Sequence, residues 1–251
     1  MMRLGGNVLS TEVAEAFSSE LKGGSSEETI RTTGYYSDVI VLRHYKSGSA
    51  KRASRVSSAP IINAGDGAAQ HPTQALLDLY TIERKFGGVD GVVIAFVGDV
   101  ANSRTIRSLC YFLAKYSGIK VHFVAPPTLN MRKDMVQYLK NHRISLSETY
   151  GLEPPLEDLA KEADVLYVTQ IPAGSFGDHL DGYEASKNNF VIDRKVLKSM
   201  KRHSILMHPL PRNGEIRPEI ERDFRVVYYD QIKYGVYIRM ALLCIVLERM
   251  P

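Results

Sequence analysis

The amino-acid sequence predicts an α/β protein built on parallel β-sheets, and two observations support this fold class. Short, continuous, β-branched runs recur along the chain, and segments with apolar residues at helical spacing separate them. Such runs are typical of strands buried on both faces, and their alternation with helices is typical of parallel sheets covered by helices on both sides. Ligands are expected at the carboxyl ends of the strands.

Six runs bounded by turn residues are predicted to be strands. They are DVIVLR (38–43), PIINA (60–64), VVIAFVG (92–98), IKVHFVA (119–125), DVLYV (164–168) and SILMH (204–208). Between and after them, three apolar stripes at helical spacing predict amphipathic helices. The stripes are Leu76 with Leu79 and Tyr80; Ile106 with Leu109, Cys110 and Leu113; and Val236 with Met240, Leu243 and Leu247.

The chain is predicted to form two α/β halves. The stretch FGGVDG (86–91) interrupts the pattern just before a new strand, which indicates a boundary. We expect the helix that follows His71 to bridge the two halves, and the last helix to return to the first half.

Composition points to an ordinary globular protein. The chain has 251 residues, of which 44% are hydrophobic and 24% charged, with a net charge of +4. The charge suits an anionic substrate, and the basic stretch 44–58 lacks the interleaved aromatic residues of a nucleic-acid surface. Neither a membrane-spanning run nor a signal peptide is found, so we expect no membrane partner and a cytoplasmic location. The two cysteines suggest neither a disulfide framework nor a metal site.

The stretch INAGDGAAQHPTQALLDLYTI (62–82) is a candidate anion site. It predicts a strand end, a glycine turn and a helix start at which His71 lies. Unpaired N–H groups and the positive end of the helix dipole favour anions there. A loop-to-helix junction without a ligand, with proline at a favoured position in the first turn of the helix, explains this stretch equally well.

Polar residues collect at several predicted strand ends. Two arginines, a histidine and a glutamine that converge on a helix start could hold a phosphate and polarise a neighbouring carbonyl. The single glycine of GDVANSRT does not fit a dinucleotide turn, the histidines lack metal-ligand spacing, and no nucleophile elbow is found. The collected residues are Arg43, His44, His71, Gln74, Arg104, His208, the Leu210 carbonyl and Arg212.

Several motifs together resemble the catalytic chain of the aspartate carbamoyltransferases, within the aspartate/ornithine carbamoyltransferase family. They are RLGGNVLST, SDVIVLRH, INAGDG–QHPTQALLDLYTI, VGD–SRT, ADVLYVT, MHPLPR–EI and YGVYIRMALL. The resemblance covers the chain from about Arg3 to its end. VLRH and RMALL favour the aspartate branch over the ornithine branch.

The resemblance implies carbamoyl transfer from carbamoyl phosphate to the amino group of L-aspartate, an early step of pyrimidine biosynthesis. It implies no metal or organic cofactor, and a homotrimer with active sites between chains. A non-catalytic chain would instead form a mixed trimer with an intact catalytic chain, and the composition predicts no nucleic-acid partner. Residues 1–71 and 234–251 would form the carbamoyl-phosphate-binding domain, and 72–233 the aspartate-binding domain.

The resemblance also implies roles for individual residues. His71 and Arg43 would be catalytic, with His71 donating to the carbonyl oxygen of carbamoyl phosphate. A loop would reach into the neighbouring chain's site with Ser19 and Lys22, and Lys22 would serve both substrates. The carbamoyl-phosphate ligands would be Arg43, His71, Gln74, Pro209, Leu210, Ser19 and Lys22; the aspartate ligands would be Arg104, Gln170 and Lys22.

The chain departs from the family pattern in two main places. The family has a segment before RLGG that ends in a serine-threonine-arginine-threonine phosphate cradle, and this chain starts at Met1, directly after that position. We therefore expect an incomplete first domain. Gln170 and Pro172 stand where the family has an arginine and a glutamine, and Asp230 stands where an arginine is usual. Glutamine cannot neutralise a carboxylate or form the bidentate arginine fork.

Three functional hypotheses stay open from the sequence. The chain is a working aspartate carbamoyltransferase, a non-catalytic relative that assembles with an intact catalytic chain, or a transcarbamoylase with a different amine acceptor. Because the cradle is absent and Gln170 and Pro172 replace two aspartate ligands of the family, we expect this chain alone to have lost most of its catalysis.

Overall fold

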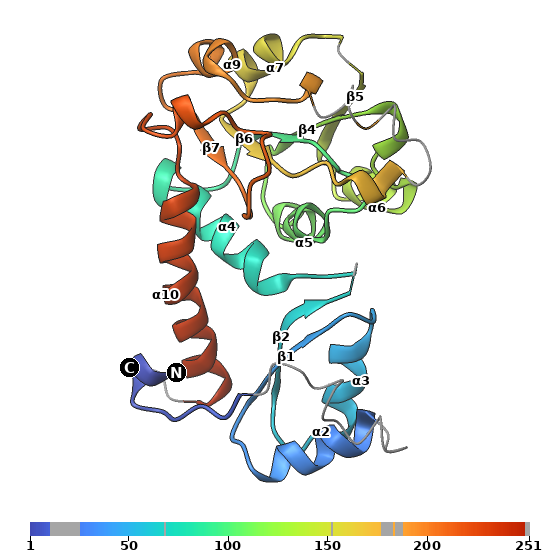
Figure 1. The fold of residues 1–251 in the computed structure, drawn as a ribbon, viewed down its shortest axis with the longest axis vertical. Coiled ribbons are helices and arrows are strands. Elements are labelled where there is room, and N and C mark those ends of the chain that lie inside the picture. Colours follow the sequence, from blue (N-terminus) through green and yellow to red (C-terminus); the bar gives the residue numbers. More distant parts are fainter. Residues whose placement is uncertain (11–25, 68, 152, 177–182, 184–187, 249–251) are drawn as a thin grey trace. The chain divides into compact units, whose positions relative to one another are not determined.

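The computed structural model describes residues 1–10, 26–67, 69–151, 153–176, 183 and 188–248. Its contacts divide the chain into two compact units, Met1–Thr73 with Gly235–Pro251, and Gln74–Tyr234. The chain passes between the units within two helices, α4 (Pro72–Phe86) and α10 (Tyr228–Val246), which Figure 1 shows.

The second unit contains a five-stranded parallel sheet in the order β5-β4-β3-β6-β7. Helices cover both faces, with α5 and α6 on one side and α7 and α9 on the other (Figure 1). This arrangement confirms the predicted α/β class. The strands are β3 (Val93–Val97), β4 (Lys120–Ala125), β5 (Ser145–Tyr150), β6 (Val165–Val168) and β7 (Ile205–Met207), and the helices are α5 (Arg104–Leu113), α6 (Lys133–Asn141), α7 (Leu156–Glu162) and α9 (Arg194–Ser199).

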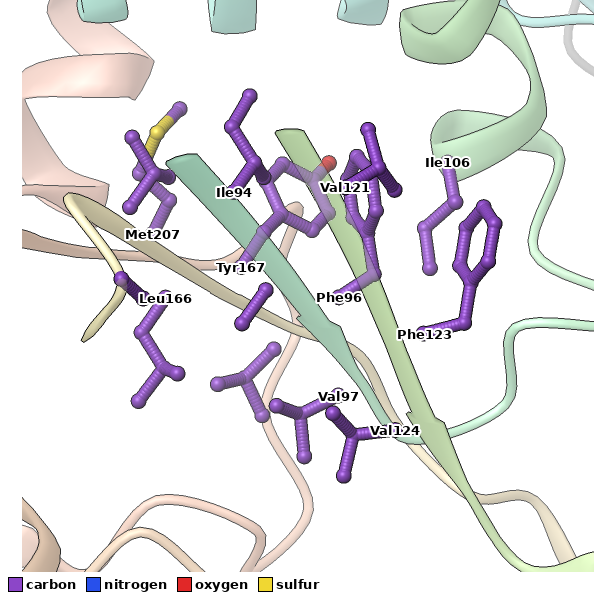
Figure 2. Close-up of a cluster of buried hydrophobic side chains, with 14 of the residues drawn as sticks. Ile94, Phe96, Val97, Ile106, Val121, Phe123, Val124, Leu166, Tyr167 and Met207 are labelled. Carbon is purple, nitrogen blue, oxygen red and sulfur yellow. The ribbon is translucent and has the colours of Figure 1, made fainter. Parts of the chain in front are cut away.

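Aromatic side chains at the middle of this sheet form its core. In the register of β3, Phe96 lies opposite Phe123 of β4 and Tyr167 of β6. The ring centroids of Phe96 and Phe123 are 5.8 Å apart, and those of Phe96 and Tyr167 are 5.5 Å apart. All three side chains are fully buried (Figure 2). The three central runs, β3, β4 and β6, therefore form strands buried on both faces, as the sequence predicts.

Strand β5 was not predicted. Its sequence SLSETY has one aliphatic residue, and most of its side chains are exposed or half-buried. It pairs with β4 alone, at the edge of the sheet. An edge strand needs hydrogen bonds on one side only, so its formation does not require the apolar run that identifies the central strands.

The first unit contains a two-stranded parallel sheet of β1 (Ile40–His44) and β2 (Ile61–Asp66). Helix α3 (Ser49–Val56) packs on both strands, and α2 (Ser26–Tyr35) packs on α3. The prediction that β1 is buried on both faces is wrong, because Val41 remains 59% exposed. Among the described residues, no second layer covers the face on which Val41 lies.

The last predicted helix is present as α10 and contains three of the four members of its apolar stripe, but most of the stripe is not buried. Of its four members only Leu243 is buried, and Val236 is 36% exposed. Met240 is half-buried, and Leu247 lies just beyond the helix end.

Four short 3-10 helices complete the described elements: Met2–Leu4, Pro127–Leu129, Ala173–Phe176 and Pro218–Ile220. Within the described part of the chain, no helix has the length and apolarity needed to cross a membrane.

Candidate active site

Three neighbouring strands of the second unit end at one edge of its sheet, and polar loops follow each of them. Strands β3, β6 and β7 are adjacent, and 98–104, 169–172 and 208–212 follow their carboxyl ends. Strands β3, β4 and β5 follow one another in the chain toward one edge of the sheet. The next strand, β6, then lies on the other side of β3. The position between β3 and β6 is therefore a topological switch point, where open α/β sheets bind ligands.

The loop after β3 depends on a glycine. Gly98 has a φ of +116°, and a Cβ atom built there would lie 2.3 Å from the carbonyl oxygen of Thr169. Only glycine permits this close approach of the β3 and β6 ends. Ser103 then caps α5, with its hydroxyl accepting from Ile106 N at 3.4 Å. The cap places the half-buried Arg104 at the first residue of the helix.

The loops after β6 and β7 are joined by a side chain. The amide of Gln170 donates a hydrogen bond to the carbonyl oxygen of Pro211. Gln170 was predicted as an aspartate ligand, and its contact with Pro211 places it beside the predicted ligands Pro209 and Leu210. In this arrangement its NH₂ group supports the neighbouring loop.

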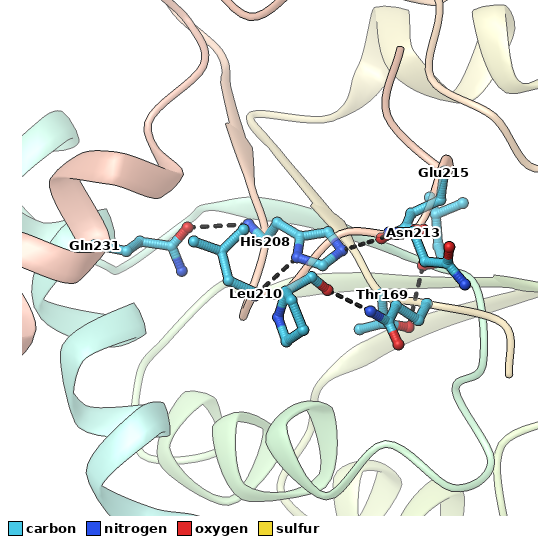
Figure 3. A network of polar contacts seen from close by, with 9 residues as sticks. Thr169, His208, Leu210, Asn213, Glu215 and Gln231 are labelled. Carbon is cyan, nitrogen blue, oxygen red and sulfur yellow. Dashed lines mark hydrogen bonds and ion pairs between the residues drawn. The ribbon is translucent and has the colours of Figure 1, made fainter. Parts of the chain in front are cut away.

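His208 fixes the shape of the loop after β7. Its side chain is 1% exposed, and Nδ1 accepts a hydrogen bond from Leu210 N at 2.8 Å. Nε2 lies 2.7 Å from Oε1 of Glu215, within ion-pair distance but without hydrogen-bond geometry. Figure 3 shows these contacts. His208, which the sequence places among the polar residues at strand ends, therefore has a buried ring that organises Leu210.

Leu210 has an unusual backbone conformation. Its φ is +53°, in the left-handed region that non-glycine residues rarely occupy, and the following peptide bond to Pro211 is cis. Left-handed φ values at non-glycine residues cluster at binding and catalytic sites, where the surrounding structure holds them. Sequence reasoning selected the Leu210 carbonyl but gave no sign of this conformation.

Glu215 and Arg212 hold the loop from the far side. Burial alone would raise the pKa of Glu215, but contacts with His208 and the amide of Asn213 leave it below its ordinary value. Arg212 forms an ion pair of 2.9 Å with Glu221 and lies 4.8 Å from the ring centroid of Tyr228. The sequence groups Arg212 with the candidate site residues. Its contacts with Glu221 and Tyr228 show that it holds the loop after β7 in place.

Three described candidate residues belong to the first unit. His44, the last residue of β1, accepts a hydrogen bond at Nδ1 from Lys46 N at 3.0 Å. Arg43 is exposed near the carboxyl end of β1. His71 is half-buried directly before α4, with its Nδ1 3.4 Å from the hydroxyl of Thr73. Nearby, the Asp66 carboxylate accepts hydrogen bonds from the amides of Gly48 and Ser49, both at 2.9 Å, and so holds the start of α3.

Gln74, in the first turn of α4, has a partner that sequence reasoning missed. Its Nε2 donates to Oδ1 of Asp78 at 3.0 Å, and Asp78 is completely buried. Burial raises the pKa of Asp78 to about 7, which its three hydrogen bonds oppose only in part. The predicted Leu76 and Leu79 stripe is half-buried, whereas the opposite, partly polar face is the most buried. A glutamine and an aspartate four residues apart in an apolar helix are the signal that could have found this pair.

Three further observations complete the site. The candidate loop residues Ser19 and Lys22 lie outside the described residues. Asp230, which departs from the family pattern, forms an ion pair of 2.7 Å with Lys85 at the surface. In the described ranges, no group of three or more histidine, cysteine, aspartate or glutamate side chains is placed to hold a metal ion.

Two family models match the chain. The carbamoyl-P binding domain of aspartate/ornithine carbamoyltransferase matches residues 1–84, and the Asp/Orn binding domain matches residues 90–246. The chain belongs to the aspartate/ornithine carbamoyltransferase family. The two matches meet at the glycine-rich turn that follows α4, in the stretch where the sequence indicates a boundary.

Curated relatives of this chain include aspartate carbamoyltransferases. A chloroplastic enzyme of Pisum sativum is 49% identical over 98% of this chain and 62% of its own length. The catalytic subunit of Thermococcus gammatolerans is 44% identical over 97% of this chain and 77% of its own. The chain thus spans less than two thirds of the length of the pea relative.

Solved structures confirm the transcarbamoylase fold. The catalytic subunit of aspartate transcarbamoylase from Methanocaldococcus jannaschii has a TM-score of 0.89 and 43% identity, covering 99% of this chain and 78% of its own. The Trypanosoma cruzi enzyme in complex with carbamoyl phosphate has a TM-score of 0.89 and 39% identity, covering 97% and 76%. The resemblance to the aspartate branch is therefore confirmed.

Proposed function

We propose that this chain binds carbamoyl phosphate and transfers its carbamoyl group to the amino group of L-aspartate, a step of pyrimidine biosynthesis. The observation that carries the proposal is 49% identity to an aspartate carbamoyltransferase over nearly the whole chain, with the candidate ligands retained at strand ends and helix starts. The related Trypanosoma cruzi enzyme is solved with carbamoyl phosphate and aspartate.

The reaction requires a polarised carbonyl and a stabilised leaving phosphate. The amine nitrogen forms a bond to the carbamoyl carbon, the bond from that carbon to the phosphate oxygen breaks, and phosphate leaves with the electron pair. The amine proton passes to the departing phosphate or to solvent. In this proposal His71 and Arg43 donate to the carbonyl oxygen on which negative charge develops, and Arg104 pairs with a carboxylate of aspartate.

A second candidate function is a non-catalytic or altered-acceptor chain. It is favoured by Gln170, which occupies the position of an arginine in the family and whose amide contacts Pro211. A neutral side chain leaves one carboxylate of aspartate without its bidentate partner. We therefore expect aspartate to bind this chain weakly, and a less acidic amine to be a better acceptor if one exists.

Assembly and location are also proposals. We propose a homotrimer or a mixed trimer with an intact catalytic chain, in which Ser19 and Lys22 serve a neighbouring site. A cytoplasmic location stays a prediction; the plant relatives are named as chloroplastic.

The test is formation of carbamoyl-aspartate from carbamoyl phosphate and L-aspartate, by this chain alone and mixed with the intact Thermococcus gammatolerans subunit. Turnover by the chain that His71→Ala abolishes, and His203→Ala leaves unchanged, would support the first function. His203 is an exposed histidine away from the strand ends, so its variant is a matched control. No turnover alone, with altered activity in the mixture, would support the non-catalytic chain.

A further inference from the structure

Asp78 is a buried carboxylate at the centre of the second unit, surrounded by hydrogen-bond donors. Tyr167 Oη donates to Oδ2 at 2.7 Å, and the amides of Gln231 and Gln74 donate to Oδ1 at 2.7 and 3.0 Å. Its side chain has no exposed surface, and among the described residues no cation forms an ion pair with it. Three donors from α4, β6 and α10 therefore supply its entire stabilisation.

This arrangement fixes the orientation of two carboxamides. An ionised carboxylate accepts hydrogen bonds and cannot donate them, so Gln74 and Gln231 must both turn their NH₂ groups toward Asp78. The carbonyl oxygen of each amide then points away from Asp78. In Gln231 this oxygen accepts from the backbone N–H of His208 at 2.9 Å (Figure 3). In the half-buried Gln74 it faces away from the buried network as a hydrogen-bond acceptor.

The network reaches further elements that carry candidate site residues. Through Gln231 it holds the backbone of His208, whose ring in turn holds Leu210. Through Tyr167 it reaches the start of α5, because the Thr105 hydroxyl donates to Tyr167. Thr105 directly follows Arg104, so one buried carboxylate connects three predicted ligand-bearing segments.

We propose that Asp78 is a positioning residue that sets the Gln74 carboxamide and the His208–Leu210 backbone to receive the NH₂ group of carbamoyl phosphate. The amide NH₂ is the only strong donor of that substrate at neutral pH, and the outward Gln74 oxygen and the Leu210 carbonyl are acceptors. Asp78 acts through these groups and does not contact the substrate. The inference rests on the proposed function for the identity of the ligand, whereas the hydrogen bonds around Asp78 are observed in the structure.

The first measurement needs no ligand. In ¹⁵N-labelled protein at pH 8, Asp78→Asn should shift the side-chain NH₂ signals of Gln74 and Gln231 and the backbone amide signal of His208. The signal of Gln137, whose amide is bonded to Asn141 on α6, should stay in place. An unmoved His208 signal would overturn the coupling to the loop, whatever the chain binds.

The second measurement compares carbamoyl phosphate with acetyl phosphate, which has a methyl group in place of NH₂. Wild-type chain should bind carbamoyl phosphate more tightly, and Asp78→Asn should weaken that binding about tenfold while changing acetyl phosphate binding little. Thr81→Val is the matched control, because Thr81 is fully buried one turn along α4 and its hydroxyl donates to the helix carbonyl of Leu77 at 2.7 Å. It should keep the preference for carbamoyl phosphate.

The outcomes separate the two proposals. If wild type binds carbamoyl phosphate and Asp78→Asn keeps the preference over acetyl phosphate, the positioning role is overturned and the proposed function stands. If wild type binds neither compound, the proposed function fails, and the ligand-free signals alone decide whether Asp78 positions Gln74 and the loop.

Discussion

The two parallel sheets of this chain are formed by similar apolar runs of sequence, but their strands are buried to different extents. In the second unit, β3 has a strand on each side and helices over both faces, and Phe96 is fully buried. In the first unit, β1 has one neighbouring strand, and Val41 is 59% exposed. The difference shows that an apolar run predicts a strand, whereas burial of both its faces depends on the layers that cover it.

The largest expected effect tests this contrast in the core. Phe96→Ala should lower the free energy of unfolding by about 4 kcal/mol, because it removes a ring packed between Phe123 and Tyr167. Urea unfolding followed by circular dichroism measures the loss. A loss below about 1 kcal/mol would show that the second sheet is not the rigid core described above.

A pH dependence of stability should reveal the buried carboxylate of Asp78 in the second unit. The pKa of Asp78 is raised from 3.8 to about 7, so its contribution to stability is greatest below pH 4 and is lost as the pH rises through 7. Relative to Asp78→Asn, wild type should lose on the order of 3 kcal/mol over that window, since each pKa unit corresponds to about 1.4 kcal/mol.

The control for this prediction is Thr81→Val, a change at a buried residue of α4 that does not ionise. Its effect on the free energy of unfolding should be the same at pH 4 and at pH 7. A stability difference between wild type and Asp78→Asn that is flat across this window would contradict the raised pKa of the buried Asp78 carboxyl group.

A smaller effect is expected at the switch point. Gly98→Ala should cost about 2 kcal/mol, because its Cβ would lie 2.3 Å from the Thr169 carbonyl and its φ is +116°. Gly88→Ala is the matched control, since a Cβ there meets no atom within 4 Å and its φ is not positive. Melting temperatures of the two variants measure the difference, and equal values would argue against the close approach of β3 and β6.

The smallest effect is expected in the first sheet. Val41→Thr should change the free energy of unfolding by less than about 0.5 kcal/mol, because the side chain is mostly in solvent. The same substitution at Val97, which is fully buried at the end of β3, should cost clearly more. A large cost at Val41 in the same denaturation experiment would show that something covers this strand in solution.

Prediction from sequence succeeded where a local pattern and its tertiary context agree. The central strands have apolar sequences and are covered by helices on both faces, so their burial could be predicted from the sequence. Gln170 and Leu210 follow adjacent strands, so their proximity follows from the strand ends. Strand β5 was missed because an edge position needs no apolar run, and α4 was assigned the wrong buried stripe because its buried face includes Asp78. Whether a polar residue is buried depends on donors from distant segments, which periodicity does not show.

Leu210 has a consequence for binding energetics. Its left-handed backbone is maintained before any ligand arrives, through the hydrogen bond from its N–H to the ring of His208. The conformational entropy of this loop is therefore given up when the protein folds and not when a ligand binds. With a more flexible residue such as glycine at this position, the loop would lose that conformational entropy when a ligand binds. The carbonyl of residue 210 would then be ordered only in the complex.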